Sequence, residues 1–268
     1  MIKWLFSDID GTILPYDRPF SPKTVDVLSV CPVPLTLVSG RMPVLMMPMI
    51  NHLVLSGIQC GNNGAVIFNV DDGKLTTLKT FPLKVATAVT VMTVLAEQFP
   101  DVHYCWFGLN EWFANGIDDG VQGEADYTGI DPQIQNRPSA SDEVLALLVI
   151  VQGLSLREQI IKVIQQLKLP DLQLFWTGGG YLEMTSQEAG KAAALRYVCQ
   201  QYGLQKDELA VFGDGGNDLP MLEAAGWPVA VANAVPTIKQ AAQIVAPADV
   251  DDGVARQIEC WQREGRLA

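Results

Sequence analysis

Three apolar runs in this chain each end abruptly in a small polar residue beside a glycine, and this repeated pattern constrains the fold more than any other feature. The runs are WLFSDIDG at 4–11, LTLVSGR at 35–41 and LAVFGDGG at 209–216. Short runs rich in β-branched, aromatic and leucine residues predict buried strands. Helical patterns lie elsewhere, as at 191–201, which stops at Gly203, and at 218–225, which stops at Gly226. Strands alternating with helices predict βαβ units, and therefore an α/β fold with a parallel sheet.

The polar tips of these strands predict a site. In an open parallel sheet, ligands bind outside the carboxyl ends of the strands, so the three tips could converge on one crevice. If the extended conformation continues past the first run, Asp8 and Asp10 share a face, about 6–7 Å apart. Two carboxylates there repel each other, so either one takes up a proton or a cation keeps both ionised. The alternative interpretation is an acidic turn that closes a surface strand.

Composition limits the classes of partner. The chain has 268 residues, 49% of them apolar and 18% charged, which is typical of an ordinary globular protein with one large or two modest domains. The formal charge is −12, without a lysine or arginine cluster that could follow a phosphate backbone. This argues against nucleic acid as a partner. The same charge repels small anions, so a phosphate site here needs a local cation.

The cysteines and the hydropathy pattern indicate a compartment. Five cysteines are widely spaced and form no CxxC motif, which is typical of free thiols in a reducing environment. The longest apolar stretch, 144–151, is too short to span a bilayer, and no basic and apolar leader opens the chain. We therefore expect a cytoplasmic protein that does not bind membranes, and that is a monomer or a small homo-oligomer.

The middle of the chain has its own helices and strands. Expected elements are a helix at 83–99, an aromatic strand region at 102–115, a strand at 144–151, a helix at 156–167 and a strand pair at 172–184 around Gly178, Gly179 and Gly180. Such a block can form a separate layer. We predict a discontinuous core domain of residues 1–81 and 186–268, with an α/β domain of residues 82–185 inserted into it.

Four segments resemble the motifs of the haloacid dehalogenase superfamily, in the order and spacing of its Cof-type phosphatases. They are DIDGTI at 8–13, VSGR at 38–41, a lysine at 191 that opens a helix, and GDGGNDLPML at 213–222. The tail segments GWPVAVANA and DDGVARQIE are similar to that subfamily as well. The resemblance implies a Rossmann-like parallel-sheet core with an inserted α/β cap of type IIB. It also implies Mg²⁺-dependent hydrolysis of small phosphorylated metabolites, such as sugar or cofactor phosphates, through an aspartyl-phosphate.

The resemblance assigns roles to the acidic residues. Asp8 would be the nucleophile, as in other aspartyl-phosphate enzymes, and Asp10 the general acid and base. The Mg²⁺ ligands would be the carboxylate of Asp8, the backbone carbonyl of Asp10 and the carboxylate of Asp214, because a hard cation prefers oxygen ligands. A cation in this place would let the two carboxylates of the first motif share a face.

Other residues complete the expected site. Ser39, Gly40 and Lys191 would bind the phosphoryl group, and Thr12, Asn217 and Asp218 would support the catalytic residues. Asn63 is a weak candidate for a substrate contact, because the family often has Asn-Gly-Ala at this place. One departure from the pattern is that alanine, where the family usually has glycine, follows Lys191. Each residue alone also fits an ordinary turn, cap or surface position.

Two other functions remain open from the sequence. A phosphomutase would return the phosphoryl group from Asp8 to a sugar phosphate. A catalytically silent regulator would bind a phosphosugar without reacting, although retention of the aspartates and Lys191 argues against it. The aromatic residues Trp106, Phe107, Trp112, Phe113 and Trp176 could face a sugar or ring substrate, but strand aromatics usually pack in a core.

Overall fold

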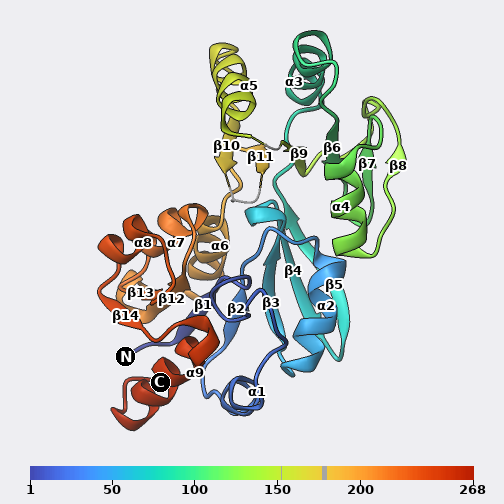
Figure 1. Ribbon diagram of the computed structural model, residues 1–268. Coiled ribbons are helices and arrows are strands. Elements are labelled where there is room, and N and C mark those ends of the chain that lie inside the picture. The colour runs from blue at the N-terminus through green and yellow to red at the C-terminus, as the bar shows by residue number, and fades with distance from the viewer. Residues whose placement is uncertain (152, 177–179) are drawn as a thin grey trace. The chain divides into compact units, whose positions relative to one another are not determined.

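The computed structural model describes residues 1–151, 153–176 and 180–268, which form two compact units. The core unit comprises Met1–Lys79 and Gly190–Ala268, and the inserted unit comprises Thr80–Ala189. The expected sequence borders were 81 and 186. Figure 1 shows the elements of both units, which are described separately below.

The core unit contains a five-stranded parallel sheet with the order β14-β13-β12-β1-β2. Its strands are β1 (Trp4–Ser7), β2 (Leu35–Leu37), β12 (Leu209–Gly213), β13 (Trp227–Val231) and β14 (Ile244–Ala246). In the central strand, Phe6 lies opposite Val211 on one side and Thr36 on the other. All residues of β1, β2 and β12 are buried, as expected for a parallel sheet with both faces covered.

Helices cover both faces of this sheet. The helices of the core unit are α1 (Pro22–Ser29), α2 (Pro43–His52), α6 (Ala192–Tyr202), α7 (Leu219–Ala224), α8 (Pro236–Ala241) and α9 (Gly253–Arg263). Short 3₁₀ turns lie at Asn62–Gly64 (η1), Lys206–Glu208 (η2), Gly216–Asp218 (η3) and Asp249–Asp251 (η4). The chain moves outward in opposite directions from β1 and from β12, so right-handed crossovers put α1 and α7 on opposite faces. Accordingly, α1 contacts α9, whereas α7 contacts α6 and α8 (Figure 1). The strand order therefore reverses between β1 and β12, where ligands of such sheets bind.

A three-stranded sheet extends the core unit. It has the order β3-β4-β5, with β3 (Gly57–Gly61), β4 (Val66–Asp71) and β5 (Lys74–Thr80). A bridge between Val38 and Cys60 places the end of β3 beside the end of β2. The turn η1, which follows β3, thus lies near the tips of the parallel strands.

The inserted unit is built on a six-stranded sheet with the order β10-β11-β9-β6-β7-β8. The strands are β6 (Tyr104–Phe107), β7 (Trp112–Ala114), β8 (Gln133–Ile134), β9 (Ala146–Ile150), β10 (Leu172–Trp176) and β11 (Tyr181–Ser186). Its helices are α3 (Val85–Gln98), α4 (Asp119–Thr128) and α5 (Leu154–Gln166). All its strand pairs are antiparallel except β7 with β8.

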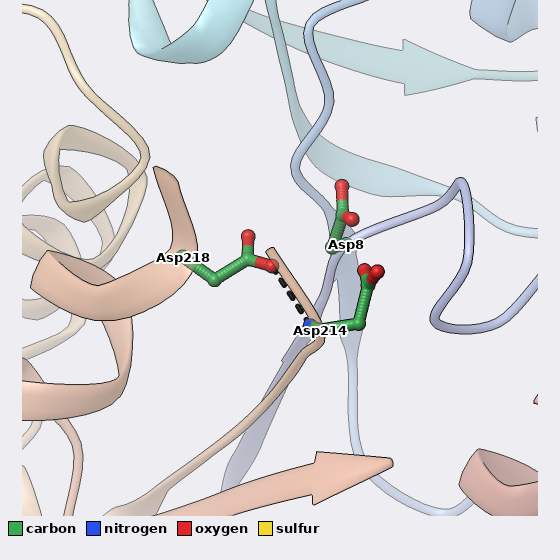
Figure 2. A group of neighbouring side chains, drawn as sticks. All are labelled: Asp8, Asp214 and Asp218. Atoms are coloured by element: carbon green, nitrogen blue, oxygen red, sulfur yellow. Dashed lines mark hydrogen bonds between the residues drawn. The ribbon is translucent and has the colours of Figure 1, made fainter. Parts of the chain in front are cut away.

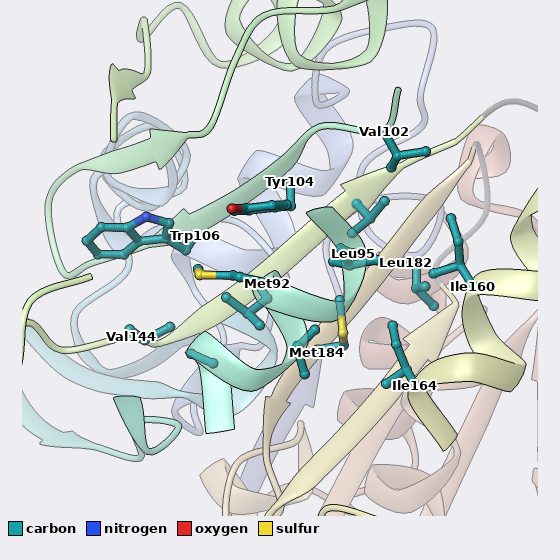
Figure 3. Close-up of a cluster of buried hydrophobic side chains, with 14 of the residues drawn as sticks. Met92, Leu95, Val102, Tyr104, Trp106, Val144, Ile160, Ile164, Leu182 and Met184 are labelled. Atoms are coloured by element: carbon teal, nitrogen blue, oxygen red, sulfur yellow. The ribbon is translucent and has the colours of Figure 1, made fainter. Parts of the chain in front are cut away.

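An apolar cluster forms the core of the inserted unit. It joins α3 and α5 to one face of the sheet, with Met92, Ile160 and Leu182 among its buried members (Figure 3). The interpretation of the strand aromatics as core residues is confirmed for four of them, which are buried: Trp106, Phe107, Trp112 and Phe113. The fifth, Trp176, is half-buried, and the guanidinium of Arg157 lies 3.6 Å from its ring centre.

The end of β1 and the role of Gly226 differ from the sequence expectations. Strand β1 ends at Ser7, so the extended conformation does not reach Asp10; the carbonyl of Ile9 accepts hydrogen bonds from the N–H groups of Thr12 and Ile13 and closes a turn. Helix α7 ends with Ala225 in an extended conformation, so Gly226 is not its left-handed cap. A Cβ at Gly226 would lie 2.5 Å from the Cα of Asp207, so close backbone packing explains that glycine.

The expected strand pair at 172–184 is present as β10 and β11. Two glycines of its turn, Gly178 and Gly179, lie outside the described residues. Among the helices that the structure describes, none combines the length and the apolar character needed to cross a bilayer.

Candidate active site

The candidate site lies at the carboxyl ends of the two central strands of the core sheet. Asp8 directly follows β1, and its N–H donates to the carbonyl of Phe212 in β12 at 3.1 Å. Asp214 directly follows β12. Because neighbouring parallel strands end at the same edge, the two aspartates come together from opposite ends of the chain. This is the point at which the strand order reverses.

Lys191 is the centre of the polar network. It precedes α6, is only 2% exposed, and its Nζ donates to Asp8 Oδ1 at 2.6 Å and to Asp218 Oδ1 at 2.7 Å. Burial by itself lowers the pKa of a lysine, but the carboxylates of Asp218 and Asp8 outweigh it and raise the pKa of Lys191. Lys191 is therefore a cation held between two carboxylates.

Asp218 is fully buried and fixes the loop that carries Asp214. Its Oδ2 accepts hydrogen bonds from the backbone N–H groups of Asp214 and Gly215, each at 2.9 Å. Figure 2 shows the bond from Asp214. A Cβ at Gly213 would lie 2.6 Å from the Cβ of Asp218, so only glycine allows this close approach. Both carboxylate oxygens of Asp218 are thus occupied by protein donors.

The carboxylates of Asp8 and Asp214 lie next to each other and share one hydroxyl. Thr12 Oγ1 donates to Asp214 Oδ1 at 2.7 Å and lies 3.5 Å from Asp8 Oδ2. Burial, followed by the charge of Asp218, raises the pKa of Asp8, and Lys191 offsets only part of this effect. Burial also raises the pKa of Asp214. A cation bound between these two carboxylates would stabilise the ionised form of both and so counteract the rise in their pKa values.

The site fits a hard metal ion. Ligand oxygens of Asp8, Asp214 and Asp218 all lie within 4.8 Å of one another. Lys191 and backbone N–H groups occupy the oxygens of Asp218, Lys191 also binds Asp8 Oδ1, and Thr12 binds Asp214 Oδ1, so the carboxylate oxygens left to a cation are Asp8 Oδ2 and Asp214 Oδ2. Oxygen ligands of this kind suit Mg²⁺. Asp8 and Asp214 would hold the ion, and Asp218 would position them.

Asp10 is held apart from this cluster. Its carboxylate accepts two hydrogen bonds from Arg41, at 2.8 Å from Nε and 2.6 Å from Nη2. Its backbone carbonyl accepts the hydroxyl of Tyr16 at 3.3 Å. Arg41 and Tyr16 were not singled out in the sequence. The signal for Arg41 was present, because it is the last residue of the VSGR segment.

The other predicted phosphate-binding residues lie at the tip beyond β2. Ser39 is buried; its Oγ accepts the N–H of Arg41 at 3.1 Å, and its carbonyl accepts the N–H of Asn63 at 2.9 Å. Gly40 is exposed. The structure therefore brings this segment to the edge at which Asp8 lies, with an exposed backbone at Gly40 and an anchored side chain at Ser39.

The turn η1 packs against the segment that carries Lys191. Asn62, Asn63 and Gly64 have φ values of 48°, 49° and 96°, a left-handed conformation that is uncommon for residues other than glycine. A Cβ at Gly64 would lie 2.0 Å from the carbonyl oxygen of Gly190. Asn63 Oδ1 accepts the side-chain N–H of Asn217 at 3.1 Å. One buried turn therefore contacts the neighbours of both Lys191 and Asp218.

Comparisons with known proteins identify the class. The family model of haloacid dehalogenase-like hydrolases matches residues 5–258. A Haemophilus influenzae protein named "Putative phosphatase" is 31% identical over 97% of this chain and 98% of its own length. A phosphoglycolate phosphatase of Methanothrix thermoacetophila is 25% identical over the full length of both chains.

Solved structures show the same fold. A haloacid dehalogenase-like hydrolase from Bacteroides thetaiotaomicron has a TM-score of 0.83 at 24% identity, covering 97% of this chain and 99% of its own. A subclass IIB sugar phosphatase of this superfamily has a TM-score of 0.81 at 19% identity, with 97% and 99% covered.

The chain belongs to the haloacid dehalogenase-like hydrolase family. The predicted family, the fold class with its parallel-sheet core and the hydrolase class of phosphatase type are confirmed.

Proposed function

We propose that this protein is a Mg²⁺-dependent phosphatase that hydrolyses small phosphorylated metabolites, sugar or cofactor phosphates, through an aspartyl-phosphate on Asp8. The observation that carries the proposal is the buried Lys191, which binds both Asp8 and Asp218 while Asp214 lies beside them. This arrangement provides a nucleophile, a fixed cation and oxygen ligands at one strand edge. The names of the relatives support phosphate esters as the substrate class.

In the first step, an oxygen of Asp8 attacks the phosphorus and the bond to the leaving oxygen breaks. The phosphoryl group is then held on Asp8, and Asp10 gives its proton to the leaving alkoxide. Lys191 keeps the Asp8 carboxylate in place through its bond to Oδ1. In this structure Arg41 holds the carboxylate of Asp10 by two bonds, so Asp10 must leave Arg41 to take up and donate a proton.

In the second step, water attacks the phosphorus and the bond to Asp8 breaks. Asp10 now accepts the proton of that water, which releases inorganic phosphate and restores the carboxylate of Asp8. Ser39 and Gly40 lie at the neighbouring strand tip, where a hydroxyl and a backbone N–H suit phosphoryl oxygens. When bound, Mg²⁺ offsets the charge of the phosphoryl oxygens and keeps Asp8 and Asp214 ionised.

Charge and cysteine content support a small-molecule substrate and a cytoplasmic location. A charge of −12 makes nucleic acid a poor partner and fits small molecules that bind where a local cation inverts the field. All five cysteines are free, which supports the cytoplasm as the compartment.

The experiment that tests the proposal separates Asp8 from Asp10. In Asp8→Asn, no covalent phosphoryl-enzyme and no product should form with any substrate, because the nucleophile is gone. In Asp10→Asn, hydrolysis of alkyl phosphates should fall roughly 10²- to 10⁴-fold, and the first step with an aryl phosphate should suffer less. The phosphoryl form should accumulate in this variant, since activation of water is lost. Rapid quench with labelled substrate, followed by acid precipitation, measures it.

Three results would contradict parts of this proposal. Label on the Asp8→Asn protein would remove Asp8 as the nucleophile. Equal losses for aryl and alkyl esters in the first step of Asp10→Asn would remove Asp10 as the acid. Full activity in EDTA would contradict the metal requirement.

A further inference from the structure

Tyr16 places an aromatic ring at the edge of the carboxylate cluster. The residue is 79% exposed, although tyrosine rings in folded chains are usually half-buried or more. Its hydroxyl is nevertheless directed inward and donates to the carbonyl of Asp10 at 3.3 Å. The loop after the first motif therefore holds a large ring in solvent, anchored by its polar end.

The ring lies on the side of Gly11 that faces Asp214. A Cβ at Gly11 would lie 2.7 Å from Asp214 Oδ2 and 2.9 Å from Tyr16 Cε2, so both atoms lie within about 3 Å of one point. Gly11 itself has φ of 79°, which only glycine adopts readily. The tight turn at Gly11 thus brings an exposed ring next to a carboxylate of the cluster.

We propose that Tyr16 is a specificity-determining residue, whose exposed ring packs against the C–H face of an uncharged, cyclic leaving group such as a sugar ring. This inference rests on the proposed phosphatase function. A phosphoryl group at Asp8 places the organic part of the ester outside the cluster, and Tyr16 is an apolar surface at that border. An open-chain leaving group holds no such face in a fixed conformation against this ring.

Charge favours an uncharged leaving group. Lys191, the buried cation of the cluster, is already bound to Asp8 and Asp218. Arg18 pairs with Asp17, directly after Tyr16. A second negative charge on the leaving group would meet carboxylates on this side, which disfavours it.

The test compares ring and open-chain substrates in matched pairs. The first pair is glucose 6-phosphate and sorbitol 6-phosphate, which differ only in the ring closure and the two hydrogens it removes. The second is 4-nitrophenyl phosphate and acetyl phosphate, whose leaving groups need little protonation. The quantity measured is the ratio of kcat/KM for the ring substrate to that for the open-chain substrate, in wild type, Tyr16→Ala and Tyr16→Phe.

We expect Tyr16→Ala to lower this ratio about 2- to 10-fold, mainly through KM, because contacts of one aromatic face are of that size. Tyr16→Phe keeps the ring and should keep the ratio. Tyr202→Ala is the matched control, since Tyr202 is also exposed but lies at the far end of α6. It should leave the ratio unchanged.

The outcomes distinguish a failure of the proposed phosphatase function from a failure of the inference about Tyr16. If wild type hydrolyses none of the four substrates, or the Asp8→Asn variant matches it, the proposed function fails. If wild type is active but the ratio is the same in Tyr16→Ala, the inference about Tyr16 fails alone. Equal losses for ring and open-chain substrates in Tyr16→Ala and Tyr16→Phe would make Tyr16 a support for the carbonyl of Asp10, and would also overturn it.

Discussion

The two units of this chain bury different kinds of side chain. In the core unit, Lys191, Asp8 and Asp218 are all at most 7% exposed, and each charge is bound by another. In the inserted unit, the buried cluster is made of aliphatic and aromatic side chains between α3, α5 and the sheet. Leu182 and Met184 in it are fully buried.

We expect the stability of the two units to respond differently to substitution, to pH and to a bound cation. A buried charge is costly unless its partner is present, so the core network depends on each member, on pH and on a bound cation. An apolar cluster is stabilised by the area removed from water and by close packing, neither of which depends on pH or metal. Three experiments, in order of expected effect, test this contrast.

The largest effect is expected from Lys191→Met. Removal of the cation leaves two buried carboxylates unpaired, which should lower the free energy of unfolding by about 3–5 kcal/mol and abolish turnover. The pKa of Asp8, already above its ordinary value of 3.8, should rise further. The native variant then keeps this proton to a higher pH than the native wild type does, so the deficit should grow as the pH rises through the raised pKa of Asp8.

Urea denaturation at pH 5 and pH 8 measures this dependence. The matched control is Lys23→Met, which removes an exposed pair with Glu259 and should cost less than about 1 kcal/mol at either pH. A loss for Lys191→Met that does not change with pH would show that its carboxylate partners are not the cause.

A somewhat smaller effect is expected from Leu182→Ala in the inserted unit. The variant leaves a cavity in the apolar cluster and should lower the free energy of unfolding by about 3 kcal/mol. No charge is involved, so the loss should be the same at pH 5 and pH 8. Leu154→Ala, on the exposed side of α5, should cost no more than about 0.5 kcal/mol. If the loss in free energy of unfolding caused by Leu182→Ala depended strongly on pH, the proposed difference between the two units would be wrong.

The smallest effect is expected from the metal. Mg²⁺ at a hundred times its dissociation constant should stabilise the core unit by about 2.7 kcal/mol and raise its Tm by about 5–10 °C. The shift should vanish in Asp214→Asn and persist in Asp101→Asn, which changes an exposed carboxylate of the inserted unit. Differential scanning fluorimetry in Mg²⁺ and in EDTA measures both. Identical Tm values for wild type in the two buffers would contradict binding of the cation to the core unit.

Sequence patterns predicted the elements and the edge at which chemistry gathers. The apolar runs at β1, β2 and β12 became adjacent parallel strands, and the residues after them, among them Asp8, Ser39 and Asp214, came to one edge. This was predictable because strand type and polar tips are local properties, and parallel strands must end at the same edge. The catalytic roles of these residues remain proposals.

The sequence by itself thus determined the α/β class and the pairing of the strand tips, whereas the tertiary structure alone decided which side chains touch. Nothing local shows that Arg41 binds Asp10, that Tyr16 faces the carboxylates, or that Gly64 packs against Gly190. Such contacts depend on turns whose φ values and approach distances are set by packing between segments far apart in the chain. Because β1 ends at Ser7 and a turn follows, Asp10 binds Arg41 instead of sharing a face with Asp8, and periodicity does not fix where a strand ends to within a few residues.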